Sequence, residues 1–346
     1  MTARTSSIST PSLPLGADAF AAVVAKLRAS AGLSAKADIG RAAARLGIGG
    51  TDAVRVGDDC AAIPDGEGFL LFAIEGFMNE FVAGDPWFAG WCGVMVNLSD
   101  IAAMGGRPLA VVDAVWAAGE DGAAPVLDGL RAACERFGVP LVGGHTNLST
   151  DRGQLSVAVL GRANRLLTSF DARPGETLIA AIDLRGRYRE PFSNWEAATD
   201  APAARLKGDL ELLPLIAERG LARAAKDISQ GGVVGTAAML AECSNVGVEI
   251  DLARVPAPAG IDPARWLMSF PSYGYLLSAS AAGTPAILAS FEQRGIAAAA
   301  IGTVTADRRV TVTHQGAREV IWDFNRDRLL GCAAGTGTGT GTEDAA

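Results

Sequence analysis

Hydrophobic positions in the first half of the chain follow helical spacing in some segments and form short continuous runs in others. Residues 18–30 (DAFAAVVAKLRAS) have apolar side chains at helical intervals, which predicts a helix. The apolar runs at 69–74 and 108–117 predict buried strands. The segment PWFAGWCGVMVNLSDIAAMG (86–105) is apolar, rich in small residues and ends at a glycine pair, so it predicts a long buried helix.

The same patterns continue to the end of the chain. In the first half they predict a helix at 126–138, a strand followed by a loop at 140–147, and a strand at 154–163. In the second half they predict strands and helices in alternation, with a loop at 224–232. The predicted strands are 176–184, 274–280, 299–305 and 308–314, and the predicted helices are 209–220, 232–247 and 283–295. Such alternation in both halves favours two α/β or α+β domains.

Turn-forming residues divide this pattern. The segment SFDARPGE (169–176) combines turn-forming residues and precedes a new apolar run, so the chain is expected to divide near 165–175. We therefore place domains at 17–168 and 169–332. Residues 1–16 are rich in Ser, Thr and Pro, and residues 333–346 are a Gly-Thr repeat followed by an acidic tail. Neither end offers much apolar surface to bury, and both are predicted to be disordered.

Composition and charge narrow the class of protein. The chain has 346 residues, of which 49% are hydrophobic and 20% charged, and its net charge is −8. These values are typical of a globular protein, and the acidic balance without a basic patch argues against nucleic-acid binding. We see no apolar run of membrane-spanning length and no signal peptide. Five scattered cysteines without CxxC spacing predict reduced thiols and a cytoplasmic location, and two histidines make a His-rich zinc site improbable.

Carboxylates interrupt apolar, small-residue surroundings in two places of the first half. Asp58 and Asp59 lie in VRVGDDCAAI, where an exposed turn is the favoured interpretation of the segment alone. Asp100 lies three residues after Asn97, so the two share a face of the predicted helix. Taken alone, this second pair is compatible either with a helix cap or with oxygen ligands for a hard cation such as Mg²⁺.

Glycine pairs follow two predicted strands. In KDISQGG, Asp227 and Ser229 precede Gly231 and Gly232, which open an apolar helix, and the backbone N–H groups of such a helix start can bind phosphate. A capping residue with turn glycines is the alternative. A similar strand-end loop is expected in VGGHTN (142–147), where Gly143 and Gly144 precede His145 and Thr146. Together with the acidic segments, the two loops favour a site for a metal and a phosphate.

The order of these motifs resembles the AIR synthase (PurM-like) superfamily. The matching segments are GDDCA, IEG, VNLSDIAAMGGRP, GGHT and KDISQGG, spread over about residues 20–330, and the overall pattern is nearest in character to thiamine-monophosphate kinase. The resemblance implies a PurM-like two-domain fold, with an N-terminal α+β domain that forms a dimeric β-barrel and a C-terminal α/β domain. It also implies a homodimer that binds ATP in a cleft and holds Mg²⁺ with aspartates.

Residue by residue, the resemblance assigns Asp58, Asp59, Asp100 and Asp227 to metal binding, with Glu75 and Asn97 in support. We therefore place the nucleotide at Asn97 and the two glycine loops, and we expect Asp58, Asp100 and His145 to be the catalytic residues. The chain departs from the family in two places: Glu75-Gly76 stands where thiamine-monophosphate kinase typically has a D-T pair, and His145 stands where the family has a carboxylate after the glycine pair. A neutral imidazole is a poorer Mg²⁺ ligand than a carboxylate, so His145 is expected to contact phosphate or to act as an acid or base.

The acceptor substrate is a small molecule whose identity the sequence leaves open. Arg185, Arg187 and Arg189 suit a phosphate or carboxylate, although a solvated basic loop is an equal alternative. Tyr273, in FPSYGYLL, is a further candidate contact. The leading hypothesis is an enzyme that uses the γ-phosphate of ATP on a small metabolite. The alternative is a nucleotide-binding scaffold that has lost catalysis and supports a partner enzyme.

Overall fold

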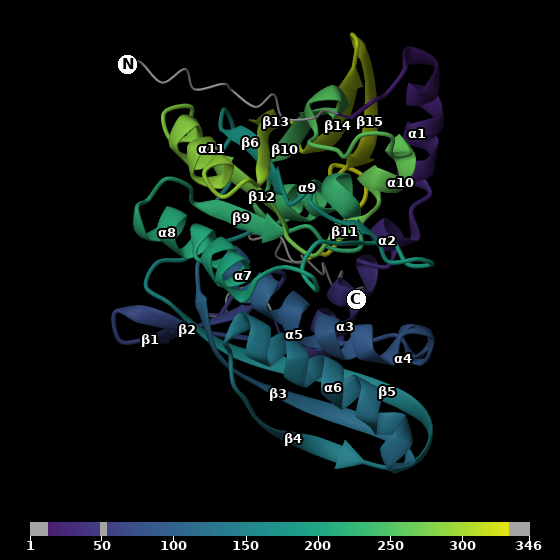
Figure 1. Ribbon diagram of the computed structural model, residues 1–346. Helices are drawn as coiled ribbons and strands as arrows, with labels where there is room; N and C mark the ends of the chain where they lie inside the picture. The colour runs from purple at the N-terminus through teal and green to yellow at the C-terminus, as the bar shows by residue number, and fades with distance from the viewer. Residues whose placement is uncertain (1–12, 49–53, 332–346) are drawn as a thin grey trace, which may run out of the picture.

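The computed structural model describes residues 13–48 and 54–331, and Figure 1 shows two domains stacked on one another. The lower domain contains a five-stranded sheet in the order β1-β2-β5-β3-β4, whose only parallel pair among the described residues is β3–β4. Its elements are β1 (Ala61–Asp65), β2 (Gly68–Gly76), α4 (Asn79–Gly84), α5 (Pro86–Ala103), β3 (Arg107–Ala118), α6 (Gly119–Phe137), β4 (Leu141–Asn147) and β5 (Ser149–Ala163).

The upper domain is built on a seven-stranded mixed sheet in the order β15-β14-β10-β13-β6-β12-β9. Its elements are β6 (Thr177–Ile182), β7 (Arg187–Tyr188), β8 (Asn194–Glu196), α7 (Ala203–Leu210), α8 (Leu212–Glu218), β9 (Ala224–Asp227), α9 (Gly232–Cys243), β10 (Gly247–Asp251), η2 (Leu252–Arg254), α10 (Pro263–Leu267), β11 (Phe270–Pro271), β12 (Gly274–Ala279), α11 (Thr284–Glu292), β13 (Ala297–Thr305), β14 (Arg309–His314) and β15 (Ala317–Asp323). Strands β7, β8 and β11 form a small separate sheet.

Helix α5 is the long buried helix that the apolar run predicts. It begins where Asp85 accepts a hydrogen bond from the backbone N–H of Phe88 (3.1 Å) and Pro86 occupies the first turn, which is a favourable helix start. Small residues allow close packing, because a Cβ atom at Gly90 would lie 2.1 Å from the carbonyl oxygen of Val126 in α6. Helices α5 and α6 together cover one face of the five-stranded sheet (Figure 1).

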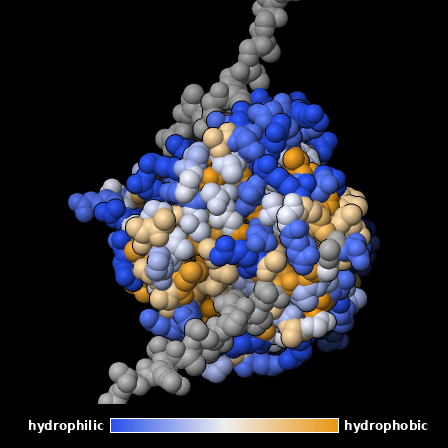
Figure 2. All heavy atoms as spheres, turned by 90° about the horizontal axis from the view of Figure 1, so that it is seen from above, coloured by the Kyte–Doolittle hydropathy of each residue, from blue (hydrophilic) through white to orange (hydrophobic). Residues whose placement is uncertain are grey.

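The opposite face of that sheet is apolar and exposed. Strand register places Phe72 beside Leu160, and Ile74 beside Ala158, which in turn pairs with Val112. These positions alternate with the buried residues under α5, as a two-residue period requires. Ile74 is 68% exposed and Phe72 49% exposed. On the face seen from above in Figure 2, by contrast, hydrophobic residues are interspersed with hydrophilic ones.

The N-terminal segment packs on the second domain. It contains η1 (Ala17–Ala19), α1 (Phe20–Arg28), α2 (Ala31–Ser34) and α3 (Ala37–Leu46). Phe20 and Leu27 belong to the same hydrophobic cluster as β10 and β14. Leu13, inside the segment predicted to be disordered, is buried and donates its N–H to the carbonyl of Val255 (3.1 Å). Its apolar side chain has a partner that the local composition does not reveal. Residues 1–12 and 333–346 lie outside the described residues.

Two predicted loops are wrong in part. Ala224–Asp227 is strand β9, paired with β12, and Gly143 and Gly144 lie within strand β4, paired with β3. Glycine favours loops locally, but pairing with a neighbouring strand overrides that preference in β4. The predicted helix at 209–220 is divided between α7 and α8. As described, the five-stranded and seven-stranded sheets are open, so the barrel with a second subunit stays a prediction.

A polar bridge joins the two domains. Arg107, at the start of β3, forms ion pairs with Glu211 (2.9 Å) and with Glu218 of α8 (2.6 Å). The linker residue Asn164 donates a further hydrogen bond to Glu218 (2.9 Å). These contacts hold the second domain against the end of α5, where the acidic residues lie. None of the helices in the described ranges has the length and apolar character that a membrane crossing requires.

Candidate metal and nucleotide site

Three carboxylates from distant parts of the chain converge between the domains. Oxygen atoms of Asp59, Asp100 and Asp227 all lie within 4.8 Å of one another. Asp59 comes from the bend before β1, Asp100 from the last turns of α5, and Asp227 from the end of β9. The packing of β9 against α5 therefore assembles the cluster, which contains residues of both domains.

Helix α5 fixes two polar side chains at this point. Asn97 is fully buried and its amide donates to the carbonyl of Gly93 (2.7 Å), while its Oδ1 has no hydrogen-bond partner. Asp100 is 7% exposed, and its Oδ2 is likewise buried without a partner. Buried polar oxygens are normally satisfied, so this pair points to a missing partner. The helix-cap interpretation of Asp100 is wrong, because the cap of α5 is Asp85.

Burial and mutual repulsion disfavour the negative charges of the cluster. Burial and the nearby Asp59 raise the pKa of Asp227 to about 8, partly opposed by Lys226. Burial, Asp227 and Asp59 raise the pKa of Asp100 well above its usual value. Glu75 lies on the helix-covered face of β2, where the surrounding protein shields its carboxylate; this desolvation, together with the charge of Asp59, raises its pKa, although Lys36 lowers it. A cation among these groups would stabilise their charged forms.

Asp58 makes different contacts from its neighbour. Its Oδ2 accepts the backbone N–H of Ser169 (2.8 Å), and its Oδ1 accepts the Ser169 hydroxyl (2.7 Å) and the N–H of Asp59 (3.0 Å). Burial, followed by the charge of Asp59, raises its pKa to about 6. Asp58 therefore anchors the bend to the interdomain linker, while Asp59 extends into the carboxylate cluster.

The loop after β9 borders the cluster. Ser229 Oγ is buried without a hydrogen-bond partner, and its N–H donates to Thr236 Oγ1 (3.3 Å). Gly232 has a φ of +62°, and a Cβ there would lie 2.0 Å from the carbonyl oxygen of Leu267. This glycine is therefore required by packing. The loop leads into the start of α9, a position where backbone N–H groups favour anions.

The oxygen donors suit a hard divalent cation. Asp59, Asp100 and Asp227 offer carboxylate oxygens, and the unpartnered Oδ1 of Asn97 and Oγ of Ser229 come from the same segments. Magnesium prefers such oxygen ligands and keeps several waters. Cys60, which lies beside these carboxylates, is a poor ligand, since burial and the charge of Asp100 raise the pKa of its thiol well above its ordinary value.

Sequence reasoning missed two lysines here. Lys226 has its ammonium on a carboxylate oxygen of Asp59, with side-chain exposures of 6% and 4%. Lys36, between α2 and α3, is near enough to lower the pKa of both Glu75 and Asp227. Lys226 precedes Asp227 in the KDISQGG motif, which was its available signal; Lys36 lies in a segment with no motif.

The second glycine motif lies away from the cluster. Glu75 pairs with Val157, Val157 with Asp113, and Asp113 with Gly144, so three strand spacings, about 14 Å, separate Glu75 from Gly144. His145 is exposed and its ring lies 5.5 Å from that of Trp116. Gly143, Thr146 and His145 are thus placed on the edge strand of the sheet.

The arginines proposed for substrate binding are engaged in ion pairs. Arg185 contacts Asp183 (2.7 Å), Arg187 contacts Asp200 (2.8 Å), and Arg189 contacts Asp85 (2.8 Å) at the start of α5. Tyr273 is buried and its hydroxyl donates to the carbonyl of Asp209 (2.9 Å). These contacts tie the β7–β8 region to its surroundings, and none involves the carboxylate cluster.

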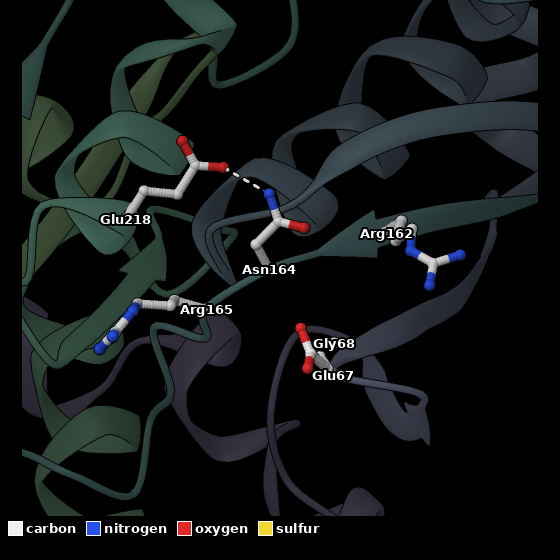
Figure 3. A pocket seen from close by; sticks show the side chains of 6 residues that line it. All are labelled: Glu67, Gly68, Arg162, Asn164, Arg165 and Glu218. Carbon is white, nitrogen blue, oxygen red and sulfur yellow. Dashed lines mark hydrogen bonds between the residues drawn. The ribbon is translucent and has the colours of Figure 1, made fainter.

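A separate pocket of about 390 Å³ lies at the domain boundary (Figure 3). Arg162 and Arg165 line it together with Glu67 and Glu218, so its charges offset one another. Arg162 is already paired with Asp65 (2.9 Å). The pocket shares no residue with the carboxylate cluster of Asp59, Asp100 and Asp227.

The chain has a PurM-like two-domain fold. Family models described as AIR synthase related protein, N-terminal domain and C-terminal domain, match residues 57–163 and 192–315. The chain therefore belongs to the AIR synthase related family, as its motifs predicted.

Three comparisons illustrate the range of this family. An uncharacterized protein of Synechocystis sp. is 45% identical over 89% of this chain and 97% of its own length. A thiamine-monophosphate kinase of Methanospirillum hungatei is 30% identical over 59% of this chain and 72% of its own. The structure of T. maritima PurL complexed with ATP superposes with a TM-score of 0.67 at 21% identity, over 80% of this chain and 46% of that one. The chain thus spans about half the length of that solved relative.

Proposed function

We propose that the protein is an ATP- and Mg²⁺-dependent enzyme that transfers the γ-phosphate of ATP to a small metabolite, or uses it to activate one. The observation that carries the proposal is the convergence of Asp59, Asp100 and Asp227, together with the buried Asp100 Oδ2 that has no hydrogen-bond partner. Relatives in the family include a kinase of a phosphorylated small molecule and a protein solved with ATP, which supports the same class of chemistry.

In this proposal both domains hold the cation, and the second domain also receives the phosphate. Asp100 and Asn97 on α5, Asp59 on the bend and Asp227 on β9 hold the divalent cation, with Glu75 nearby and Asp58 orienting the bend. The start of α9, with Ser229, receives phosphate oxygens. The bound cation supplies neutralisation of phosphate charge. Burial of α5 keeps the carboxylates in place, which is the main requirement for phosphoryl transfer.

Isothermal calorimetry with ATP and Mg²⁺ tests the site. The wild type should bind, and Asp100→Asn should weaken binding by about tenfold or more, the scale typical of disturbed metal sites. Asp128→Asn is a matched control, because Asp128 is exposed on α6 and pairs only with Arg131 (3.1 Å) among the described residues. A wild type that does not bind, or equal binding by Asp100→Asn, would rule out this assignment.

A catalytically inactive scaffold is the second candidate. It is favoured by His145, which stands where the family resemblance leads us to expect a carboxylate, and by Gly76, which stands in place of the threonine of the D-T pair. The position of His145 on the edge strand β4 agrees with this. Incubation with ATP, Mg²⁺ and a panel of metabolites separates the two functions. ADP release that depends on one metabolite supports the enzyme, whereas binding without turnover across the panel supports the scaffold.

We also propose a homodimer formed through the open face of the five-stranded sheet. Phe72, Ile74, Val112 and Leu160 form adjacent cross-strand neighbours on that face, and each is at least 38% exposed. Contiguous exposed apolar surface of this kind marks an interaction site. A second copy presents the same surface, so a two-fold arrangement would cover both at once.

A further inference from the structure

Lys226 is a buried lysine with an unusual position. Its side chain is 6% exposed, and its ammonium contacts Asp59 Oδ1 inside the carboxylate cluster. Burial alone would lower the pKa of the lysine, but the charges of Asp59, Asp58 and Asp227 raise it above its ordinary value. A buried ammonium is tolerated only when it is paired, so the carboxylates and the lysine depend on one another.

The contacts of Lys226 cross the domain boundary. Asp59 belongs to the bend before β1, whereas Lys226 and Asp227 are consecutive residues of β9. The second oxygen of Asp59 accepts the backbone N–H of Asp227 (3.2 Å). Both oxygens of Asp59 are therefore held by β9, while Asp100 Oδ2 has no such partner. Among the described residues, Lys226 is the only cation in a salt bridge with a member of the cluster.

A divalent cation and the Lys226 ammonium would share the same negative charge. The three carboxylates carry three negative charges when ionised, and the lysine offsets one of them. In the metal-free protein, the positive charge of Lys226 stabilises the carboxylate cluster. The same charge repels a divalent cation that binds close to it, and the low dielectric of the protein interior strengthens this repulsion. Removing the charge should therefore have opposite effects on the metal-free protein and on metal binding.

We propose that Lys226 is a positioning residue that serves as a built-in counter-cation: it holds Asp59 against β9 in the metal-free protein and weakens binding of free Mg²⁺. The site then binds its cation most readily as a complex with a nucleotide, because the phosphates supply negative charge in place of the carboxylate charge that Lys226 offsets. This inference rests on the proposed metal site and adds an order of assembly to it.

The test compares Lys226→Met, which removes the charge at similar length, with Lys226→Arg, which keeps it. Lys26→Met is the control, because Lys26 is exposed on α1. Calorimetry with Mg²⁺ and no nucleotide should show binding by Lys226→Met that is tighter than wild type by about tenfold, from loss of like-charge repulsion. Urea unfolding in EDTA should show Lys226→Met to be less stable, with Lys226→Arg and Lys26→Met close to wild type.

The outcomes distinguish this inference from the proposed function. If the wild type binds Mg²⁺ and Lys226→Met binds equally or more weakly, the counter-cation role is overturned and the metal site stands. If neither protein binds Mg²⁺ without nucleotide, the counter-cation role is overturned, because Lys226→Met should then bind; the metal site itself fails only if the wild type also does not bind ATP with Mg²⁺. If Lys226→Met does not fold in EDTA, Mg²⁺ should restore folding by replacing the missing charge, and failure of Mg²⁺ to do so overturns the inference.

Discussion

At the scale of single residues, the site is defined by charges held in unfavourable surroundings. Asp58, Asp100 and Asp227 all have raised pKa values, with burial as the largest cause in each case. Such perturbation is common at functional sites and also occurs in structural networks. Asp100 fits the functional case, because its Oδ2 has no hydrogen-bond partner. Asp58, next to the carboxylate cluster, fits the structural case, because it accepts three hydrogen bonds.

The pKa of Asp227 leads to a prediction for the metal-free protein. A carboxyl group whose pKa rises from 3.8 to about 8 on folding binds its proton more tightly when folded. Its contribution to the free energy of unfolding is complete below the unfolded value and is lost as pH rises through about 8. Urea unfolding in EDTA should therefore show a loss of stability between pH 5 and 8 that is smaller in Asp227→Asn, at about one kcal/mol or more of difference. Equal slopes for the two proteins would contradict this.

Asp58 yields a prediction about stability. Asp58→Ala leaves the N–H and hydroxyl of the fully buried Ser169 without their acceptor, as well as the N–H of Asp59. We expect the free energy of unfolding to fall by about 2 kcal/mol, because unsatisfied buried donors are costly. Asp65→Ala is the control: it removes an exposed ion pair with Arg162 and should cost less than about 1 kcal/mol. Similar losses for both variants would show that Asp58 is not an anchor.

At the scale of elements, α5 depends on close contact with α6. A Cβ atom at Gly129 of α6 would lie 1.9 Å from the carbonyl oxygen of Trp87 in α5, so the helices would have to separate. Asn97 and Asp100 are on α5 and would move with it. The geometry of the cluster is thus set by a helix contact that contains none of its residues.

We predict that Gly129→Ala lowers the free energy of unfolding by about 3 kcal/mol and weakens Mg²⁺ binding, since overpacking displaces α5. Gly122→Ala in the same helix is the control, because its Cβ would meet only Ala117 Cβ at 3.8 Å. That substitution should be neutral or stabilise by about 0.5 kcal/mol. Denaturant titration and calorimetry measure both effects, and a Gly129→Ala protein as stable as Gly122→Ala would refute the close-packing argument.

At the scale of the whole molecule, the two domains present surfaces of different character. The sheet of the first domain leaves one face without a covering layer, and that face carries aligned apolar side chains. The second domain covers its sheet with helices and with the N-terminal segment (Figure 1). A sheet that is covered by helices on one face and exposes apolar side chains on the other presents a surface suited to a partner.

The homodimer proposal makes a direct prediction. Ile74→Asp should convert the protein from a dimer to a monomer in size-exclusion chromatography with light scattering, because a charge would be buried at the interface. Leu215→Asp is the control, since Leu215 is similarly apolar and exposed but lies on α8 of the other domain. A wild-type monomer, or a dimer that both variants retain, would exclude this face as the interface.

The sequence by itself determined the elements with strong local patterns and the family. The run at 86–105 predicted α5 because small apolar residues, a proline start and a terminal glycine pair agree on one structure, and it placed Asn97 and Asp100 on one buried face. Only the tertiary structure decided which carboxylates meet. Asp59, Asp100 and Asp227 converge because β9 packs on α5, a contact between residues too distant in sequence to appear in any local pattern.

The same reason explains what the sequence left undecided. Gly143 and Gly144 have the composition of a loop, and pairing with β3 makes them part of a strand. Arg185, Arg187 and Arg189 have the composition of an anion site, and folding places an aspartate beside each. Lys226 opens the KDISQGG motif, but the motif does not reveal its partner, and the lysine becomes part of the site because Asp59 arrives from the other domain. Local sequence sets the chemistry that each segment offers, while long-range packing decides which of these groups meet.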